Sequence, residues 1–304
     1  MTTKLIIFDV GNAACGLAVC PNRYSLMVDC GNHGEKDCPI DLIKNDYKDW
    51  LNIRTYVKEN GNKYLLTLLH ITHPDDDHVK NAKIVKEKLP PYLLHRRKYE
   101  EFPSNENIHD EYKKHIDLEY RGDPVSFDLW GFTQTKTFRI PMEKIKKNEE
   151  LSKKIKNNSS ILRFIEYGDK KILFGGDLEK AGWDWLTEND KDFVATMQNG
   201  VDILIAPHHG HKSGFPTSLF DLTGKVEISI LSKASESEKD DTDVSSQYSK
   251  YSKGITYKNL NDGQMYFANG TLTTRSNGNI FLEINETGNI DVFAQKASAN
   301  HPKI

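Results

Sequence analysis

Three apolar segments of this chain end directly in clusters of histidine and aspartate. KYLLTLLHIT (63–72) runs into HPDDDH, KKILF (170–174) runs into GGD, and VDILIAP (201–207) runs into HHGHKS. Short apolar runs of this kind are typical of buried strands. Because polar side chains that follow such strands can converge at the carboxyl edge of a sheet, the three clusters predict one shared site.

The first cluster contains two histidines and three consecutive carboxylates. His73, Asp75, Asp77 and His78 lie where a buried strand is expected to end and a helix to begin. Adjacent carboxylates repel one another, and in a low-dielectric interior they take up protons unless a cation compensates them. An acidic helix cap is the alternative, but a cap needs only one Asp and explains neither histidine. Imidazole and carboxylate together favour Zn, Mn or Fe over Ca.

The other two clusters are weaker signals when each is taken alone. Asp177 follows two glycines, which let the backbone approach a metal or a substrate, although Gly-Gly-Asp is also an ordinary turn. His208, His209 and His211 follow the third apolar segment, and neighbouring histidines also occur as structural residues. The recurrence of the same pattern three times favours a metal centre over three unrelated turns.

The remaining pattern predicts two layers of sheet with helices outside, an α/β (α+β) architecture. Further strands are expected at 4–10, 16–20 and 24–30, which form a meander, at 159–168, and near the end of the chain at 264–268, 271–276, 279–285 and 289–295. Helices are expected over 41–60 and 77–89. Asn-Gly turns are expected at Asn269-Gly270 and Asn277-Gly278.

Composition limits the class of protein. The 304 residues, 37% hydrophobic and 28% charged, fit a single domain over 1–304, and the charged, irregular interval 92–156 is interpreted as an insertion or cap. A net charge of −3 provides no global basic field for nucleic acid or membranes. The sequence has no leader and no apolar run of the roughly 18 residues that span a bilayer, so we expect a cytoplasmic protein with no membrane contact and reduced cysteines.

THPDDDH, FGGD and PHHGHKS, in this order, resemble the metallo-β-lactamase superfamily, and in particular the hydrolase domain of the competence DNA-uptake protein ComEC. FDVGNAA (8–14), LMVDCG (26–31) and the stretch NSSILRFIEYGDKKILFGGD (158–177) extend the similarity, which covers about residues 4–232. The resemblance implies a four-layer αββα sandwich with a helical, charged insertion, and two divalent transition-metal ions, Zn or Mn, between the sheet edges.

The resemblance also implies roles for individual residues. One metal position would be held by His73 and Asp75, the other by Asp77 and His78, with Asp177 as the bridging carboxylate. His208 or His209 matches the later histidine ligand, and spacing does not choose between them; we assign His208 to the metal and His209 to catalysis. Further candidates are catalytic Asp77 and Lys212 and the possible substrate contacts Asn158, His211 and Ser213. Asn158 falls where most members have a further histidine ligand, which favours a harder ion such as Mn.

The function implied is a metal-dependent hydrolase, a nuclease or phosphodiesterase that cleaves DNA through a metal-bridged hydroxide. Basic residues after the first cluster can provide an approach for nucleic acid, or can be an ordinary solvated helix face: Lys80, Lys83, Lys86, Lys88, Arg96, Arg97 and Lys98. Two alternatives stay open, a hydrolase of a small ester, thioester or lactam and a non-catalytic partner-binding protein. A basic groove would favour nucleic acid, and a closed apolar pocket a small substrate.

Overall fold

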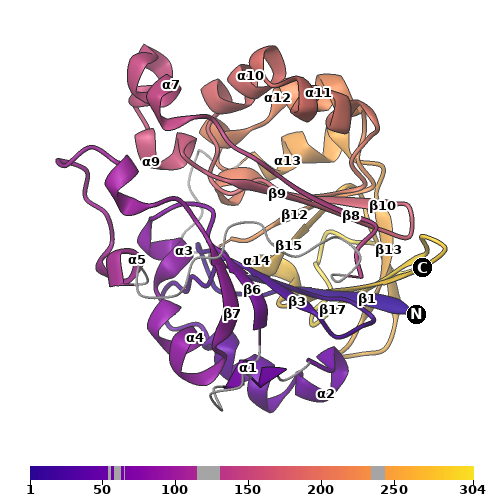
Figure 1. Cartoon of the computed structure of the whole chain (residues 1–304). Coiled ribbons are helices and arrows are strands. Elements are labelled where there is room, and N and C mark those ends of the chain that lie inside the picture. Colours follow the sequence, from indigo (N-terminus) through magenta and orange to yellow (C-terminus); the bar gives the residue numbers. More distant parts are fainter. Residues whose placement is uncertain (54–55, 58–62, 65, 115–130, 234–243) are drawn as a thin grey trace.

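Two β-sheets stacked face to face form the centre of the molecule in this computed structural model (Figure 1). The structure describes all residues except 54–55, 58–62, 65, 115–130 and 234–243. The larger sheet has the strand order β14-β13-β17-β16-β1-β2-β3-β6-β7. Its strands are β1 (Thr2–Ile7), β2 (Gly16–Val19), β3 (Ser25–Val28), β6 (Leu66–His70), β7 (Pro91–His95), β13 (Ile255–Asn259), β14 (Met265–Ala268), β16 (Ile280–Asn285) and β17 (Ile290–Ala294).

The smaller sheet has the strand order β15-β12-β11-β10-β9-β8. Its strands are β8 (Gln134–Phe138), β9 (Leu162–Tyr167), β10 (Lys170–Phe174), β11 (Ile203–Ile205), β12 (Ile228–Leu231) and β15 (Thr271–Thr273). A separate two-stranded sheet pairs β4 (Tyr56–Val57) with β5 (Lys63–Tyr64). The antiparallel meander β1-β2-β3 is confirmed, and β3, β6 and β7 then run parallel.

Helices cover the outer faces of both sheets, which completes the expected αββα sandwich (Figure 1). Along the larger sheet lie α1 (Pro39–Asn45), α2 (Lys48–Leu51), α3 (Asp76–Val79), α4 (Ala82–Lys88) and α5 (Asp110–Lys114). Over the smaller sheet lie α7 (Met142–Lys147), α8 (Glu149–Ser152), α9 (Ile155–Asn158), α10 (Lys180–Asn189), α11 (Lys191–Gln198), α12 (Thr217–Thr223) and α13 (Ser245–Tyr248); α14 (Thr274–Asn277) follows β15. No helix among the described residues is long and apolar enough to cross a membrane.

Alternation along the strands builds the core. Leu5 and Ile7 of β1 belong to one buried cluster with Ile172 of β10 and Ile203 of β11, so this cluster joins the two sheets. Ile6, between them in sequence, belongs to the second buried cluster, which contains the apolar residues of the outer helices. This is the period-two pattern of a strand buried on both faces. All four cysteines are free thiols, as expected.

Two sequence-based expectations about helices need correction, and the interval 92–156 has strands in both sheets. The helix expected over 41–60 is two short helices, α1 and α2, followed by β4, and 54–55 and 58–60 lie outside the described residues. The helix expected over 77–89 is broken into α3 and α4, because the main chain of His78 and Asn81 bonds to Cys30 instead. The interval 92–156 contributes β7 to one sheet and β8 to the other, so these two parts of it belong to the sandwich; 115–130 lie outside the described residues.

The Asn-Gly turns are also different from the expectation. β14 and β15 flank Asn269-Gly270 but belong to different sheets, so this dipeptide connects the two layers and is not a hairpin turn. Asn277-Gly278 ends the short helix α14, with Gly278 at φ 66° as the C-terminal cap. Both positions use the freedom of glycine at positive φ, but tertiary pairing decides which strands they join.

Candidate metal centre

The three polar clusters meet at one edge of the sandwich, as the sequence predicted. The cluster after β6 belongs to the larger sheet, and those after β10 and β11 belong to the smaller one. Main-chain hydrogen bonds hold these loops: Ile161, directly before β9, donates to the oxygen of Thr72 at 2.9 Å, and His208 donates to the oxygen of Gly176 at 2.9 Å. The loops are therefore held against one another by backbone as well as by side chains.

Four side chains form the centre of this site. Asp77, His78, Asp177 and His209 each present a ligand atom within 4.8 Å of the others. His78 Nε2 lies 3.0 Å from Asp177 Oδ1, and His209 Nε2 lies 3.8 Å from the same oxygen and 3.2 Å from Asp77 Oδ2. Two imidazoles and two carboxylates at this spacing are a suitable ligand set for one transition-metal ion.

The other oxygen of Asp177 faces a second group of ligands. His73 Nε2 lies 3.8 Å and His208 Nε2 lies 3.7 Å from Asp177 Oδ2, and Asp75 Oδ2 is 3.4 Å from His73 Nε2. Asp177 therefore lies between two sets of side chains, one at each of its oxygens. His208 and His209, which the sequence left as alternatives, are divided between the two sets.

Buried atoms without partners support a bound cation. Nε2 of His73 is buried and forms no hydrogen bond within the described part of the chain, and the buried His78 Nε2 and Asp177 Oδ1 face each other at 3.0 Å without hydrogen-bond geometry. An unpaired buried polar atom is costly, and protein atoms that converge on one point without bonding each other are expected where an ion binds. The residues present thus fit a divalent metal centre.

Charges in the site are strongly coupled. Burial alone disfavours a charged imidazole, but the carboxylates of Asp177, Asp29 and Asp77 outweigh it and raise the pKa of His78 well above its usual value. Burial likewise opposes ionisation of Asp177, but the neighbouring His78, His209 and His73 hold its pKa well below the usual range. These opposed shifts mean that Asp177 is an anion at neutral pH, as a metal ligand must be.

Asp29 is a site residue that sequence reasoning missed. It follows β3 at φ 58° and is 2% exposed. Its carboxylate accepts hydrogen bonds from Thr72 N, Thr72 Oγ1 and His78 Nδ1, each at 2.8 Å. A proton held on Nδ1 leaves Nε2 of His78 free to bind a metal, which is the usual role of a carboxylate behind a ligand histidine. The acidic residue in LMVDCG was the available signal.

Glu179 is a second residue that the sequence did not identify. Its Oε1 lies 3.3 Å from His208 Nδ1 and accepts a hydrogen bond from Asn157 Nδ2 at 2.9 Å. Glu179 therefore supports His208 in the same way that Asp29 supports His78. In each pair a carboxylate lies behind the imidazole and directs its Nε2 towards Asp177. Each set of ligands has one such support.

The loop that carries the two histidines is strained. His208 and His209 have φ of 49° and 54°, in the left-handed region that non-glycine residues rarely adopt. Backbone strain of this kind persists where the surrounding structure enforces it, most often at functional sites. Two successive left-handed residues turn the imidazoles to opposite oxygens of Asp177, a division that sequence spacing does not reveal.

The remaining predicted site residues lie at the rim or in the interior. Lys212 is exposed, and Ser213 Oγ lies 2.8 Å from His211 Nδ1 and 3.1 Å from His208 Nδ1. Asn158 is 1% exposed and its amide donates to the main-chain oxygen of Leu151 at 2.9 Å. The Asn158 side chain is therefore enclosed in this structure, and the substrate contact expected of it stays a prediction.

Two of the basic residues predicted to guide nucleic acid are also enclosed. Arg97 is 2% exposed and donates to main-chain oxygens of Ser159 and Ile140 at 2.7 and 2.5 Å. The Arg96 guanidinium lies 4.4 Å from the ring centre of buried Tyr112. Both therefore stabilise the fold, whereas the lysines of this group are exposed.

The opening beside the centre is acidic. A cavity of about 540 Å³ borders Asp75 and Asp77, and its other lining residues include Asp76, Asp110 and Lys156. Lys156 forms an ion pair with Asp75. Burial alone would raise the pKa of Asp75, but His73 and Lys156 outweigh it and lower this pKa. This opening is neither a basic groove nor a closed apolar pocket.

Comparison with known proteins supports the superfamily named by the motifs. The structure is similar to the metallo-β-lactamase fold protein YhfI from Bacillus subtilis (12% identity, TM-score 0.34, 68% of this chain and 71% of that chain). It is also similar to a β-lactamase from Chitinophaga pinensis (13%, TM-score 0.35, 72% and 89%) and to a diphosphatase of the PhnP family (11%, TM-score 0.36, 80% and 93%). No significant match was found among curated proteins. The family model described as Metallo-beta-lactamase superfamily matches residues 9–219, more than half of the sequence, and the chain belongs to this superfamily.

Proposed function

We propose that this chain is a metal-dependent phosphodiesterase that cleaves DNA. Members of the superfamily are metal-dependent hydrolases. The observation that carries the proposal is the arrangement around Asp177, whose two oxygens face two separate sets of histidine and aspartate ligands. A carboxylate shared between two ligand sets is the arrangement expected of a two-metal hydrolase.

The ligand set favours phosphoester substrates. Asp75, Asp77 and Asp177 provide three carboxylates, which suit harder ions such as Mn better than a site made only of histidines. Divalent ions bound here would lower the pKa of a water molecule and neutralise charge on a phosphate oxygen. The identity of the ions, Zn or Mn, is part of the proposal.

The side chains have separate tasks in this proposal. Asp77 accepts a proton from the attacking water, and His209, whose Nε2 lies 3.2 Å from Asp77 Oδ2, would bind an ion beside this carboxylate. Lys212 is exposed at the rim and contacts a non-bridging phosphate oxygen, with His211 and Ser213 beside it. Asp29 and Glu179 hold His78 and His208 in the tautomers that leave Nε2 available.

Nucleic acid as the substrate requires a further condition. The carboxylates around the opening repel a polyanion, and exposed charges are screened within about 10 Å at 0.1 M salt. We therefore expect cleavage of long DNA to rise with Mg or Mn concentration beyond that needed to fill the metal centre. Hydrolysis of the small diester bis(p-nitrophenyl) phosphate should saturate once the centre is filled.

The test is activity of chelated protein after addition of Mn, Zn or Mg. Substrates are single-stranded DNA, duplex DNA, RNA, bis(p-nitrophenyl) phosphate and small carboxylic esters. Release of phosphodiester products in Mn, abolished by Asp177→Asn, Asp75→Ala and Asp77→Ala, is the expected result. Asp76→Ala is the matched control, because Asp76 belongs to the same run but pairs with His109 at 2.9 Å outside the centre.

Other outcomes would replace the proposal. Hydrolysis of esters without phosphodiester cleavage would favour a small ester, thioester or lactam as substrate. Protein that binds no metal and has no activity, with no change in Asp177→Asn, would favour a partner-binding protein on a hydrolase fold.

A further inference from the structure

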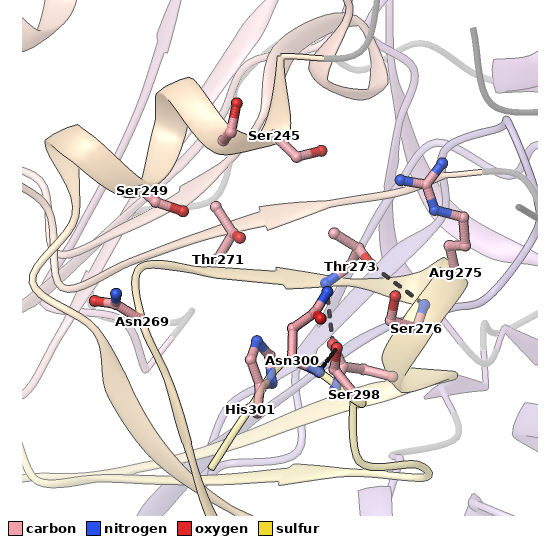
Figure 2. Close-up of a pocket in the computed structure, with 12 residues that line it drawn as sticks. Ser245, Ser249, Asn269, Thr271, Thr273, Arg275, Ser276, Ser298, Asn300 and His301 are labelled. Atoms are coloured by element: carbon pink, nitrogen blue, oxygen red, sulfur yellow. Dashed lines mark hydrogen bonds between the residues drawn. The ribbon is translucent and has the colours of Figure 1, made fainter.

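A second cavity lies outside the metal centre, between α13, β15 and the segment near the C-terminus (Figure 2). Its volume is about 370 Å³, and it shares no residue with the cluster of Asp77, His78, Asp177 and His209. This volume is within the usual range for sites of small molecules, about 300 to 1,000 Å³. The cavity is therefore large enough for a ligand of its own.

Polar residues line the cavity walls at helix and strand spacings where apolar core residues are normally found. Ser245 and Ser249 are four residues apart along the helical segment, and Thr271 and Thr273 alternate along β15 (Figure 2). Side chains with these spacings share one helix face and one strand face. Apolar residues there would pack α13 against β15, so the hydroxyls keep this gap between the two elements hydrophilic.

The chemistry of the lining is selective. Twelve residues line the cavity within the described ranges: seven have hydroxyls, three are asparagines, and the others are Arg275 and His301, so none of the twelve is a carboxylate or a lysine. Burial lowers the pKa of His301, although a hydrogen bond to the Thr271 main chain opposes this. Arg275 is thus a cation of the cavity wall at neutral pH, and the described residues that line the wall present no like charge to an anion.

The floor is organised by one buried phenol. Tyr257 is 0% exposed, and its oxygen accepts hydrogen bonds from Ser298 N at 3.2 Å and Asn277 Nδ2 at 3.3 Å. The same hydroxyl donates to His301 Nδ1 at 3.0 Å. Three lining residues are therefore held in place before any ligand binds, which lowers the entropic cost of binding.

Other lining groups have capacity for a ligand. The side chains of Ser249, Thr271 and Asn300 form no hydrogen bond within the part of the chain that the structure describes. Hydroxyl and amide groups both donate and accept, which matches the hydroxyls of a sugar. A guanidinium matches a phosphate through two parallel hydrogen bonds. Apart from the His301 imidazole, no aromatic or aliphatic side chain among the described residues lines the cavity for a base or a lipid chain.

We propose that this cavity binds a sugar phosphate, with the phosphate at Arg275 and the sugar hydroxyls at the Ser, Thr and Asn side chains. The ligand can be a free sugar phosphate or the terminal nucleotide of a nucleic acid, since both present this chemistry. The proposal concerns a site separate from the metal centre and does not depend on the hydrolytic reaction.

Isothermal titration of the metal-loaded protein tests this. Ribose 5-phosphate is the main probe, and ribose, inorganic phosphate and a 5′-mononucleotide are compared with it. Ribose 5-phosphate is expected to bind more tightly than ribose or phosphate. Arg275→Gln should weaken it about tenfold or more, the loss of charge-assisted hydrogen bonds, and Thr271→Val should weaken it about fivefold. The mononucleotide is also expected to bind. Binding tighter than that of ribose 5-phosphate would identify a terminal nucleotide as the ligand, and weaker binding would identify a free sugar phosphate.

Two controls separate the cavity from the rest of the protein. Lys250→Gln removes an exposed cation next to Ser249 that does not line the cavity, and it should leave binding unchanged. Asp177→Asn should also leave it unchanged, which excludes binding at the metal centre. No binding of ribose 5-phosphate, equal binding of ribose, or binding lost in Asp177→Asn but retained in folded Arg275→Gln would overturn the proposal.

Discussion

Replacement of Asp29 by Asn should weaken metal binding although Asp29 itself is not a proposed ligand. The carboxylate accepts three hydrogen bonds of 2.8 Å, two from Thr72 and one from His78 Nδ1. Asn retains an acceptor for Thr72 N, but its NH₂ group takes the place of the oxygen that accepts from Thr72 Oγ1 and His78 Nδ1. The imidazole must then accept on Nδ1, which moves its proton to Nε2, the atom that faces Asp177.

The expected loss is large enough to measure. One charge-assisted hydrogen bond contributes about 1.5 to 3 kcal/mol, and loss of a carboxylate behind a ligand histidine typically lowers metal affinity about 10- to 100-fold. Asn also tolerates the left-handed conformation that Asp29 adopts at φ 58°, so the substitution changes charge without adding backbone strain. The affinity for Zn or Mn is measured by competition with a chromophoric chelator.

Asp76→Asn is the control, since Asp76 lies on the ligand loop with a side chain that is 55% exposed. It should leave affinity unchanged. If Asp29→Asn binds metal within about twofold of the wild-type affinity while remaining folded, tautomer control of His78 by Asp29 is refuted.

Three further predictions follow from the same geometry. His208→Ala and His209→Ala should each lose one of two bound ions by elemental analysis, because the imidazoles face different oxygens of one carboxylate; loss of both ions in one variant and of none in the other would contradict this. Gly31→Ala should lower the free energy of unfolding in urea by about 2 kcal/mol or more, because the added Cβ would lie 1.5 Å from the main-chain oxygen of Asp77 in the ligand loop. Gly34→Ala is the control: the space around Gly34 is open, and the substitution should cost only about 1 kcal/mol. Burial lowers the pKa of His95 from 6.5 to about 3, so the free energy of unfolding is highest above pH 6.5 and falls by about 3 kcal/mol on going to pH 4.5. This pH dependence of stability should be smaller in His95→Gln. If the stability of His95→Gln changes with pH as much as that of His33→Gln, a substitution of an exposed histidine, the prediction is wrong.

Local pattern was enough for the parts of the fold in which neighbouring residues decide the outcome. The first three strands, each a short apolar run, form the predicted meander because antiparallel neighbours need only a short turn. The segment 41–60 failed because helical spacing of apolar residues does not reveal where a chain turns back into a sheet. Likewise β7 and β8 lie in an interval whose charged composition hid their pairing with β6 and β9.

The basic residues show the same limit at the level of single side chains. The sequence predicts Arg96 and Arg97 as part of a surface cluster with Lys98, but both guanidinium groups are buried. That of Arg97 donates to main-chain oxygens, and that of Arg96 lies over an aromatic ring. Sequence composition counts charges but does not say which charges face solvent. Burial of an arginine depends on partners that lie more than forty residues away.

The sequence by itself determined which residue types gather at the centre, because each ligand cluster directly follows an apolar strand and strands carry their ends to a common edge. Only the tertiary structure decided how the ligands are divided. The two oxygens of Asp177 face His78 and His209 on one side and His73 and His208 on the other. That division depends on left-handed backbone at adjacent histidines and on contacts between distant segments, and neither is encoded in the spacing of a motif.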